Sequence, residues 1–96
     1  MPMPNHILRW DAVYAVTSYD VWVRLEGGTK IHFINVVSSE CDLLPLSINP
    51  TFSESFAGNP VLVSVSAKDA NGVQGLDSEE LTYYAPLGPV TGLVII

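Results

Sequence analysis

The residues of this chain best suited to chemistry are its two histidines, His6 and His32, and its single cysteine, Cys41. Nucleophilic catalysis needs a serine or cysteine beside a base that a third group orients. Both histidines fall within predicted strands and outside any recognisable catalytic motif, so we interpret them as ordinary strand residues. We interpret Cys41 as a buried free thiol that packs as a small apolar residue. The sequence therefore predicts no catalytic residues, and we expect that the protein is not an enzyme.

One segment, from Asp69 through Asn71 to Gly72, begins like a calcium-binding loop, in which carboxylate and amide oxygens alternate. The glycine that such a loop needs two residues further on is Gln74 here, and no bidentate Glu follows at the required distance. Zinc-ligand spacing and a Gly-rich phosphate loop are also missing from the sequence. We therefore interpret the segment as a hairpin turn and expect no metal and no cofactor.

The chain is acidic, and its charge limits the partners that it can bind. Four Lys and Arg residues stand against ten Asp and Glu residues, which gives a net charge of −6 at pH 7. Such a chain offers no basic surface to nucleic acid or to an anionic membrane. The apolar residues 93–96 are far too few to span a bilayer, which takes about 20 residues. We therefore expect neither nucleic-acid binding nor membrane insertion.

Length and composition indicate a single folded domain that covers residues 1–96. Hydrophobic residues make up 48% of the chain and charged residues 15%, so it can bury a core without a metal or a disulfide. Residues 1–5 lack the basic start and the apolar run of a signal peptide. We expect a complete small protein made in a cytoplasm; an excised domain and a mature chain that has lost its leader are the alternatives.

Alternating apolar residues indicate antiparallel strands, and no segment has a helical pattern. One strand places Tyr19, Val21 and Val23 on a buried face and Asp20 and Trp22 on the opposite, outward face. Alternation, β-branched composition or both predict strands at residues 6–10, 19–25, 33–37, 61–68 and 81–85.

The middle of the chain is less regular. Residues 43–48 are predicted as a further strand, at a sheet edge or with a bulge, because Pro45 cannot donate a backbone hydrogen bond. Residues 49–60 are rich in Pro, Ser, Thr, Asn and Gly, and we predict a long surface loop there. The rings of Phe52 and Phe56 in this loop either tuck under the domain or form a contact surface.

The order of these features is similar to a known family. Trp10 closes one strand, the Tyr19, Val21 and Val23 strand follows after a loop, and a later Val63-x-Val65-x-Ala67 strand enters a turn rich in Asn and Gly. Over residues 6–85 the chain resembles a fibronectin type III domain. The resemblance implies an all-β fold, an antiparallel two-sheet β-sandwich of the immunoglobulin-like type. It does not identify a partner, because such sandwiches serve many unrelated functions.

Two departures from the family are visible. Val61 stands where the family commonly has the tyrosine of its corner motif. The family also begins with a strand that precedes the one ending in the core Trp, and residues 1–5 leave no room for it. One edge of the Trp10 strand is therefore expected to be unpaired. Residues 88–95, with Val90, Leu93 and Val94 among them, resemble the missing opening strand.

The apolar end of the chain thus has two possible places. It either pairs with its own strand at residues 81–85, or covers its own core, across a turn at 86–89. Alternatively it adds a strand to the open edge of a neighbouring subunit, a head-to-tail contact that closes a ring or continues as a filament. The residues concerned are Val90, Leu93, Val94, Ile95 and Ile96.

Two classes of function fit these features. The first is a structural subunit that binds itself or another structural protein in a large assembly. A bacteriophage virion fits best, with the chain made in the host cytoplasm as a capsid decoration or tail protein. The alternative is an extracellular or cell-surface module that binds carbohydrate through Trp22, with Tyr14 or Tyr84 nearby, because an outward Trp is a common binding anchor. Trp22 could equally lie under a strand or loop of its own domain.

Overall fold

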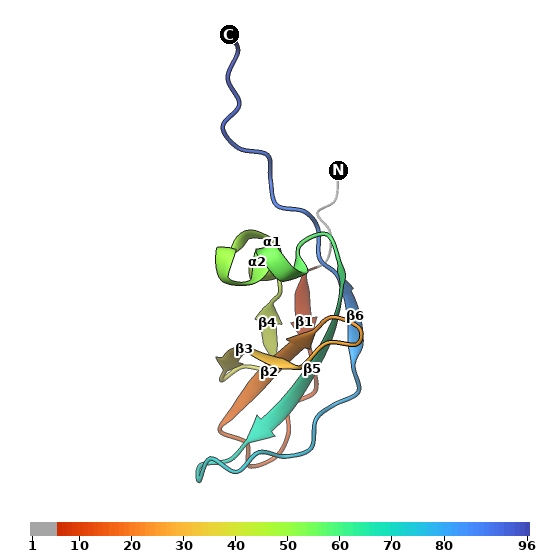
Figure 1. The fold of residues 1–96 in the computed structure, drawn as a ribbon. Helices are drawn as coiled ribbons and strands as arrows, with labels where there is room; N and C mark the ends of the chain where they lie inside the picture. The colour runs from red at the N-terminus through yellow and green to blue at the C-terminus, as the bar shows by residue number, and fades with distance from the viewer. Residues whose placement is uncertain (1–5) are drawn as a thin grey trace.

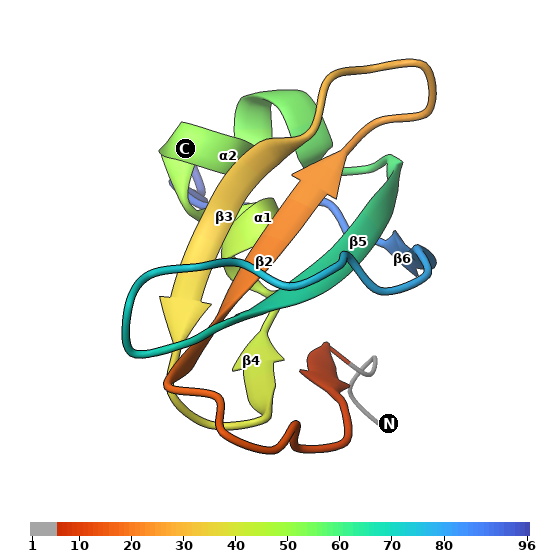
Figure 2. The same ribbon diagram turned by 90° about the horizontal axis from the view of Figure 1, so that it is seen from below.

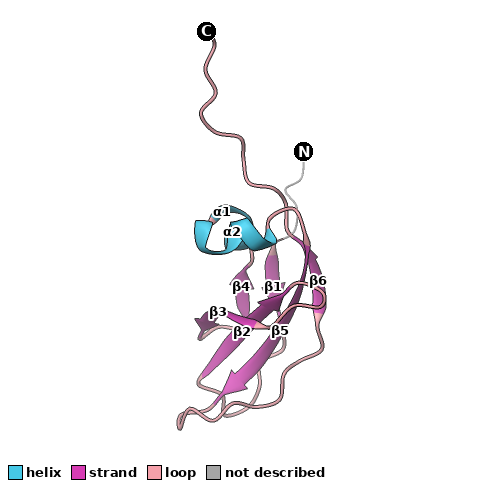
Figure 3. Ribbon diagram, in the orientation of Figure 1, coloured by secondary structure: helices cyan, strands magenta, loops and turns pink. Residues whose placement is uncertain are grey.

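The chain forms a mostly β structure in the computed structural model, which describes residues 6–96 (Figures 1 and 3). Within these residues the strands build two antiparallel sheets, one with the order β1-β4 and one with the order β3-β2-β5-β6. Two antiparallel sheets confirm the coarse fold prediction. In chain order the elements are β1 (Ile7–Arg9), β2 (Ser18–Arg24), β3 (Ile31–Val36), β4 (Glu40–Asp42), α1 (Pro45–Ile48), α2 (Pro50–Phe56), β5 (Pro60–Lys68) and β6 (Leu81–Tyr84).

The strands β2 and β5 form the centre of the larger sheet (Figure 2). Their register places Val21 opposite Val65 and Val23 opposite Val63. Val21 and Val23 are fully buried, and Val63 nearly so, as their alternation predicted. The core also includes Phe33, Cys41, Leu43, Val61 and Ala85, so both sheets contribute to it.

The segment at residues 43–48, which we predicted as a strand, instead contains the short helix α1. Pro45 takes the first helical position, where its missing N–H costs nothing because that donor has no partner within a helix. The fully buried Leu46 points into the core, whereas Ile48 is 51% exposed. The apolar residues of this segment therefore match a helix with one buried side.

The prediction of a loop at residues 49–60 is also wrong for its first half, which forms the helix α2. Asn49 caps this helix, because its side-chain oxygen accepts a hydrogen bond from the Thr51 amide at 3.0 Å, and Pro50 follows at the first position. Phe56 is 5% exposed, and the ring of Phe52 meets Phe33 edge-on, with the ring centroids 5.0 Å apart. Both rings therefore pack under the domain, where the helices close one end of it (Figure 1).

The end of the chain remains attached to the body for a few residues after β6. Ala85 exchanges backbone hydrogen bonds with Gly58 and Asn59, and Gly88 passes close to α1, since a Cβ at this position would lie 3.0 Å from the Ser47 carbonyl oxygen. Residues 90–96 then extend away from the domain (Figure 1) and belong to no strand. They neither pair with β6 nor cover their own core, which were the first of the two places considered. Residues 1–5, where we predicted no leader, lie outside the described part of the chain.

Candidate interaction site

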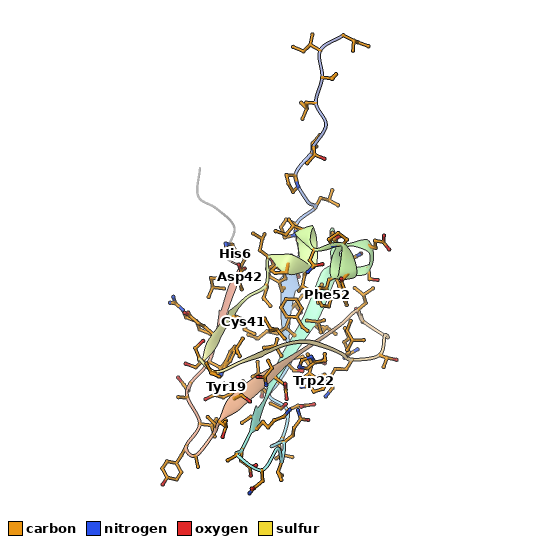
Figure 4. All side chains as sticks on the ribbon, turned by 90° about the vertical axis from the view of Figure 1, so that its left-hand side faces the viewer. His6, Tyr19, Trp22, Cys41, Asp42 and Phe52 are labelled. Carbon is orange, nitrogen blue, oxygen red and sulfur yellow. The ribbon has the colours of Figure 1, made fainter. Side chains whose placement is uncertain are left out.

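The two histidines and the cysteine are held in structural contacts. His6 Nδ1 lies 2.7 Å from a carboxylate oxygen of Asp42 (Figure 4), and His32 Nε2 lies 2.9 Å from a carboxylate oxygen of Asp20. Cys41 is a buried free cysteine, as predicted. Burial, followed by the charge of Asp42, raises the pKa of its thiol to about 11. The thiol stays protonated near neutral pH, where it is a poor nucleophile.

The segment that begins like a calcium loop forms a turn, as predicted. The Gly72 amide donates a hydrogen bond to the Asp69 carbonyl at 3.0 Å, and the Asp69 carboxylate accepts hydrogen bonds from the amides of Asn71 and Val73. Gly72 has a φ of 79°, which a glycine adopts without strain. The Asp69 side chain therefore stabilises the turn. Within residues 6–96, no three His, Cys, Asp or Glu side chains are grouped to hold a metal ion.

Asp20 is a buried carboxylate on the outward face of β2, with an exposed fraction of 2%. One of its oxygens accepts a hydrogen bond from Asn35 Nδ2 and faces His32 Nε2, both at 2.9 Å. The other accepts a hydrogen bond from Gln74 and lies 3.2 Å from Lys68 Nζ. Burial alone would raise the pKa of this carboxyl, but the hydrogen bonds from these four side chains outweigh it and hold the pKa well below its usual range.

This polar cluster joins four parts of the chain around one charge. Asp20 belongs to β2, Asn35 to its neighbour β3 and Lys68 to β5, while Gln74 follows the turn after β5. The sequence pattern placed Asp20 on the outward face, but it did not show that neighbouring side chains would cover it. The signal that could have found the cluster is the group of polar residues on the adjoining strand, His32 and Asn35. The cluster satisfies itself, so we interpret it as a structural feature of the sheet.

Trp22 lies on the same outward face, under side chains of its own domain. Its indole N–H donates a hydrogen bond to Ser66 Oγ at 3.1 Å, and the His32 ring meets it edge-on at 5.1 Å. The ammonium of Lys30 lies 4.7 Å from the ring centroid and pairs with Asp77. Trp22 is therefore half-buried in an arrangement that uses both its ring face and its polar N–H.

The other aromatic candidates do not gather around Trp22. Tyr14 is 97% exposed and Tyr84 is 75% exposed, and among the described residues neither forms a ring pair with Trp22. Phe52 and Phe56 pack against the core rather than presenting an exposed surface.

An apolar groove runs between β1 and β6 on the side where the two sheets part. Within the described residues, β1 pairs with β4 and with no other strand, so its second edge borders this groove. Leu8, Val63 and Leu81 all line it, and 61% of the surface of Leu81 is exposed. The sequence predicted the unpaired edge, but not the groove beside it. The lining residues are His6, Ile7, Leu8, Leu43, Val63, Leu81, Thr82 and Tyr83 at one end, continuing through Arg9, Trp10, Val65, Ser78 and Glu79 to Asp11, Val13, Tyr19, Ala67, Gly75 and Leu76.

The extended segment 90–96 is the second apolar surface of the molecule. Its sticks stand clear of the body in Figure 4, and each large apolar side chain in it is at least 68% exposed. Exposed apolar surface of this continuity is unusual on a folded domain. The residues are Val90, Leu93, Val94, Ile95 and Ile96.

Comparisons of the chain with protein-family models, with curated proteins and with solved structures found no match. In the part of the chain that the structure describes, every helix is too short or too polar to cross a bilayer. The fold and the site define a small, mostly β domain with two antiparallel sheets, an apolar groove along an open strand and an exposed apolar segment.

Proposed function

We propose that this chain is a non-enzymatic structural subunit that acts through protein–protein contacts in a large assembly. The assembly that we favour is a bacteriophage virion, with the chain as a capsid decoration or tail protein. The observation that carries the proposal is segment 90–96, which extends away from its own domain with its large apolar side chains exposed. Covering apolar surface gains about 25 cal/mol for each Å² removed from water, so such a segment is well suited to bind a protein partner.

The proposal includes the fold type, a fibronectin type III-like sandwich. Trp10, just after the first strand, packs edge-on against Tyr19, with ring centroids 5.2 Å apart. The two strands that the resemblance places after Trp10 are present as β2 and β5. A two-stranded sheet facing the four-stranded sheet β3-β2-β5-β6 supports this type. Sandwich domains are common scaffolds for surface contacts, but the virion itself is favoured by analogy of fold.

The test of this function is the composition of assembled particles. Particles are purified by density gradient from the organism or phage that encodes the chain, and their proteins are identified by mass spectrometry. The proposal expects peptides of this chain in the particle fraction at a fixed ratio to the major structural protein. Finding the chain only in the soluble fraction, with no binding to purified particles, would overturn it.

A second function, an accessory module that binds carbohydrate, is favoured by the exposed rings of Tyr14 and Tyr84, since sugars stack on exposed aromatic rings. The parent protein is screened on a glycan array beside Trp22→Ala, Tyr14→Ala and Tyr84→Ala. Binding that is lost in one of these variants, with the fold kept, supports this function. An array on which the parent binds no glycan removes it.

A further inference from the structure

We propose that segment 90–96 of one copy of this chain docks in the β1–β6 groove of a second copy and adds a strand to the open edge of β1. This inference rests on the proposed function and names the partner and the contact surface. Both halves of the contact are present in the chain: a groove lined largely by apolar side chains and a segment whose large apolar side chains are exposed. Four features of the structure support this pairing: the backbone groups that β1 directs at the groove, the strand polarity, the reach of the segment and the place where it leaves the body.

The first feature is the backbone of β1, which directs N–H and C=O groups at the groove that have no strand partner among residues 6–96. The Leu43 amide donates to the His6 carbonyl at 2.7 Å, and the Trp10 amide donates to the Ser39 carbonyl at 3.0 Å. Hydrogen-bonded and non-hydrogen-bonded positions alternate along an antiparallel pair. His6 and Trp10 are hydrogen-bonded positions, so the backbone N–H and C=O of Leu8, which lies between them, also point toward β4. The N–H and C=O groups of Ile7 and Arg9 therefore face the other way, toward the groove. A docked strand can pair with both residues.

The second feature is the direction of the strands along the groove. His6, just before β1, lines the same end of the groove as Thr82 near the end of β6, whereas Trp10, just after β1, lines it beside Ser78, which precedes β6. The strands β1 and β6 therefore run in opposite directions, and a strand antiparallel to β1 runs in the direction of β6. Segment 90–96 leaves the body in that direction (Figure 1). A second copy displaced along it receives the segment with antiparallel polarity, without any rotation of the copy.

The third feature is the reach of the segment. At about 3.3 Å per residue, residues 90–96 span roughly 23 Å. Residues 6–11, which border the groove, cover roughly 20 Å at the same rise. Strand alternation puts Leu93 and Ile95 on one face and Val94 and Ile96 on the other. Either face therefore presents apolar side chains to a groove with Val63 and Leu81 in its walls.

The fourth feature is the place where the segment leaves its own body, which favours a second copy over the chain's own groove. Gly88 passes close to Ser47 in α1, and the next residues continue outward from there. To enter its own groove, the segment would have to reverse direction after this point and then run parallel to β1. Parallel pairs are slightly less stable per residue than antiparallel ones. Repeated from copy to copy, the contact joins two different surfaces, so it builds a filament or closes a ring.

The test uses two complementary variants of the full-length chain. The segment variant carries Leu93→Glu and Val94→Glu, which place a charge on each face of the segment. The groove variant carries Leu81→Glu, at an exposed position in the groove wall. The matched control carries Val37→Glu and Tyr14→Glu, two substitutions at highly exposed residues outside the groove. Circular dichroism checks the fold of each, and light scattering over a concentration series measures the mass of each alone and of an equal mixture of the first two.

We expect the parent and the control to assemble, and each of the two variants alone to remain monomeric, with self-association weakened about a hundredfold or more by the buried charges. Their mixture forms a dimer and stops there, because it has one intact segment and one intact groove per pair. A mixture that stays monomeric, variants that still assemble, or a monomeric parent would each overturn the inference. The composition of purified particles is a separate readout: the structural role remains if the chain is found there, whichever contact holds it.

Discussion

Asp20 carries a buried charge on which the stability of the fold should depend. Four side chains surround a carboxylate that is 2% exposed, and removing one member of such a buried charged group leaves the others unpaired. Asp20→Asn keeps the size of the side chain but turns an N–H₂ group toward other donors. We expect it to lower the free energy of unfolding by about 2–4 kcal/mol. Urea unfolding at neutral pH measures this loss. Asp11→Asn, which removes the same charge from an exposed position, is the control and should change little.

The depressed pKa of Asp20 also predicts how stability depends on pH. The unfolded chain binds the proton at the ordinary Asp pKa of about 3.9, whereas the folded chain binds it only at lower pH. The unfolded state therefore takes up more protons as the pH falls. The stability that the charge provides is complete well above about pH 4 and is lost below it. We expect the difference in unfolding free energy between the parent and Asp20→Asn to shrink as the pH is lowered from about 6 to about 3. A difference that stays constant would contradict the depressed pKa.

At the scale of single residues, sequence alternation predicted which side chains face the core but not which polar ones are covered. Val21 and Val23 are buried as expected because burial follows from the period of a strand. Asp20 and Trp22 face outward as expected, yet Gln74 and Lys30 cover them from distant parts of the chain. Those contacts depend on where the segments after β5 and before β3 come to lie against β2, and strand alternation does not contain that information.

At the scale of elements, the prediction failed where two short helices replaced a strand and part of a loop. Residues 43–48 alternate like a strand, and a single helical turn is too short to show its own period. Asn49 followed by Pro50 was the available signal, because this pair is typical of a helix N-terminus. Tertiary packing of Leu46 and Phe56 provides the rest of the stability, and this packing cannot be read from local sequence.

A helix and a strand at residues 45–48 predict different effects of substitution at Leu46 and Ile48. In a strand, Leu46 and Ile48 would share a face and have similar environments, whereas in the helix Leu46 is fully buried and Ile48 is 51% exposed. We expect Leu46→Ala to lower the unfolding free energy by about 2–5 kcal/mol. Ile48→Ala should change it by about 0.5 kcal/mol or less. Urea unfolding of the two variants side by side decides this, and equal losses would favour the strand.

At the scale of the whole molecule, the sequence predicted that one edge of the strand ending in Trp10 would be unpaired. It left open whether the apolar end of the chain returns to its own domain. In the structure Gly88 passes close to α1, and residues 90–96 continue from there in the direction of β6. The direction of the segment thus depends on how the chain before it packs against α1, which is distant in sequence. Strand patterns alone do not contain this information.

Docking of the segment predicts a change in hydrogen exchange at β1 that is specific to single amides. In the dimer formed by mixing the segment variant and the groove variant, only the segment variant, which keeps an intact groove, is labelled with ¹⁵N. The amides of Ile7 and Arg9 face the groove, whereas that of Leu8 faces β4. We expect exchange at Ile7 and Arg9 to slow at least about tenfold when the unlabelled groove variant is added, because a docked strand shields these amides. The Leu8 amide is the internal control, since β4 protects it in both states. Slowing at Leu8 alone, or equal slowing at all three, would mean that the partner binds without adding a strand to this edge.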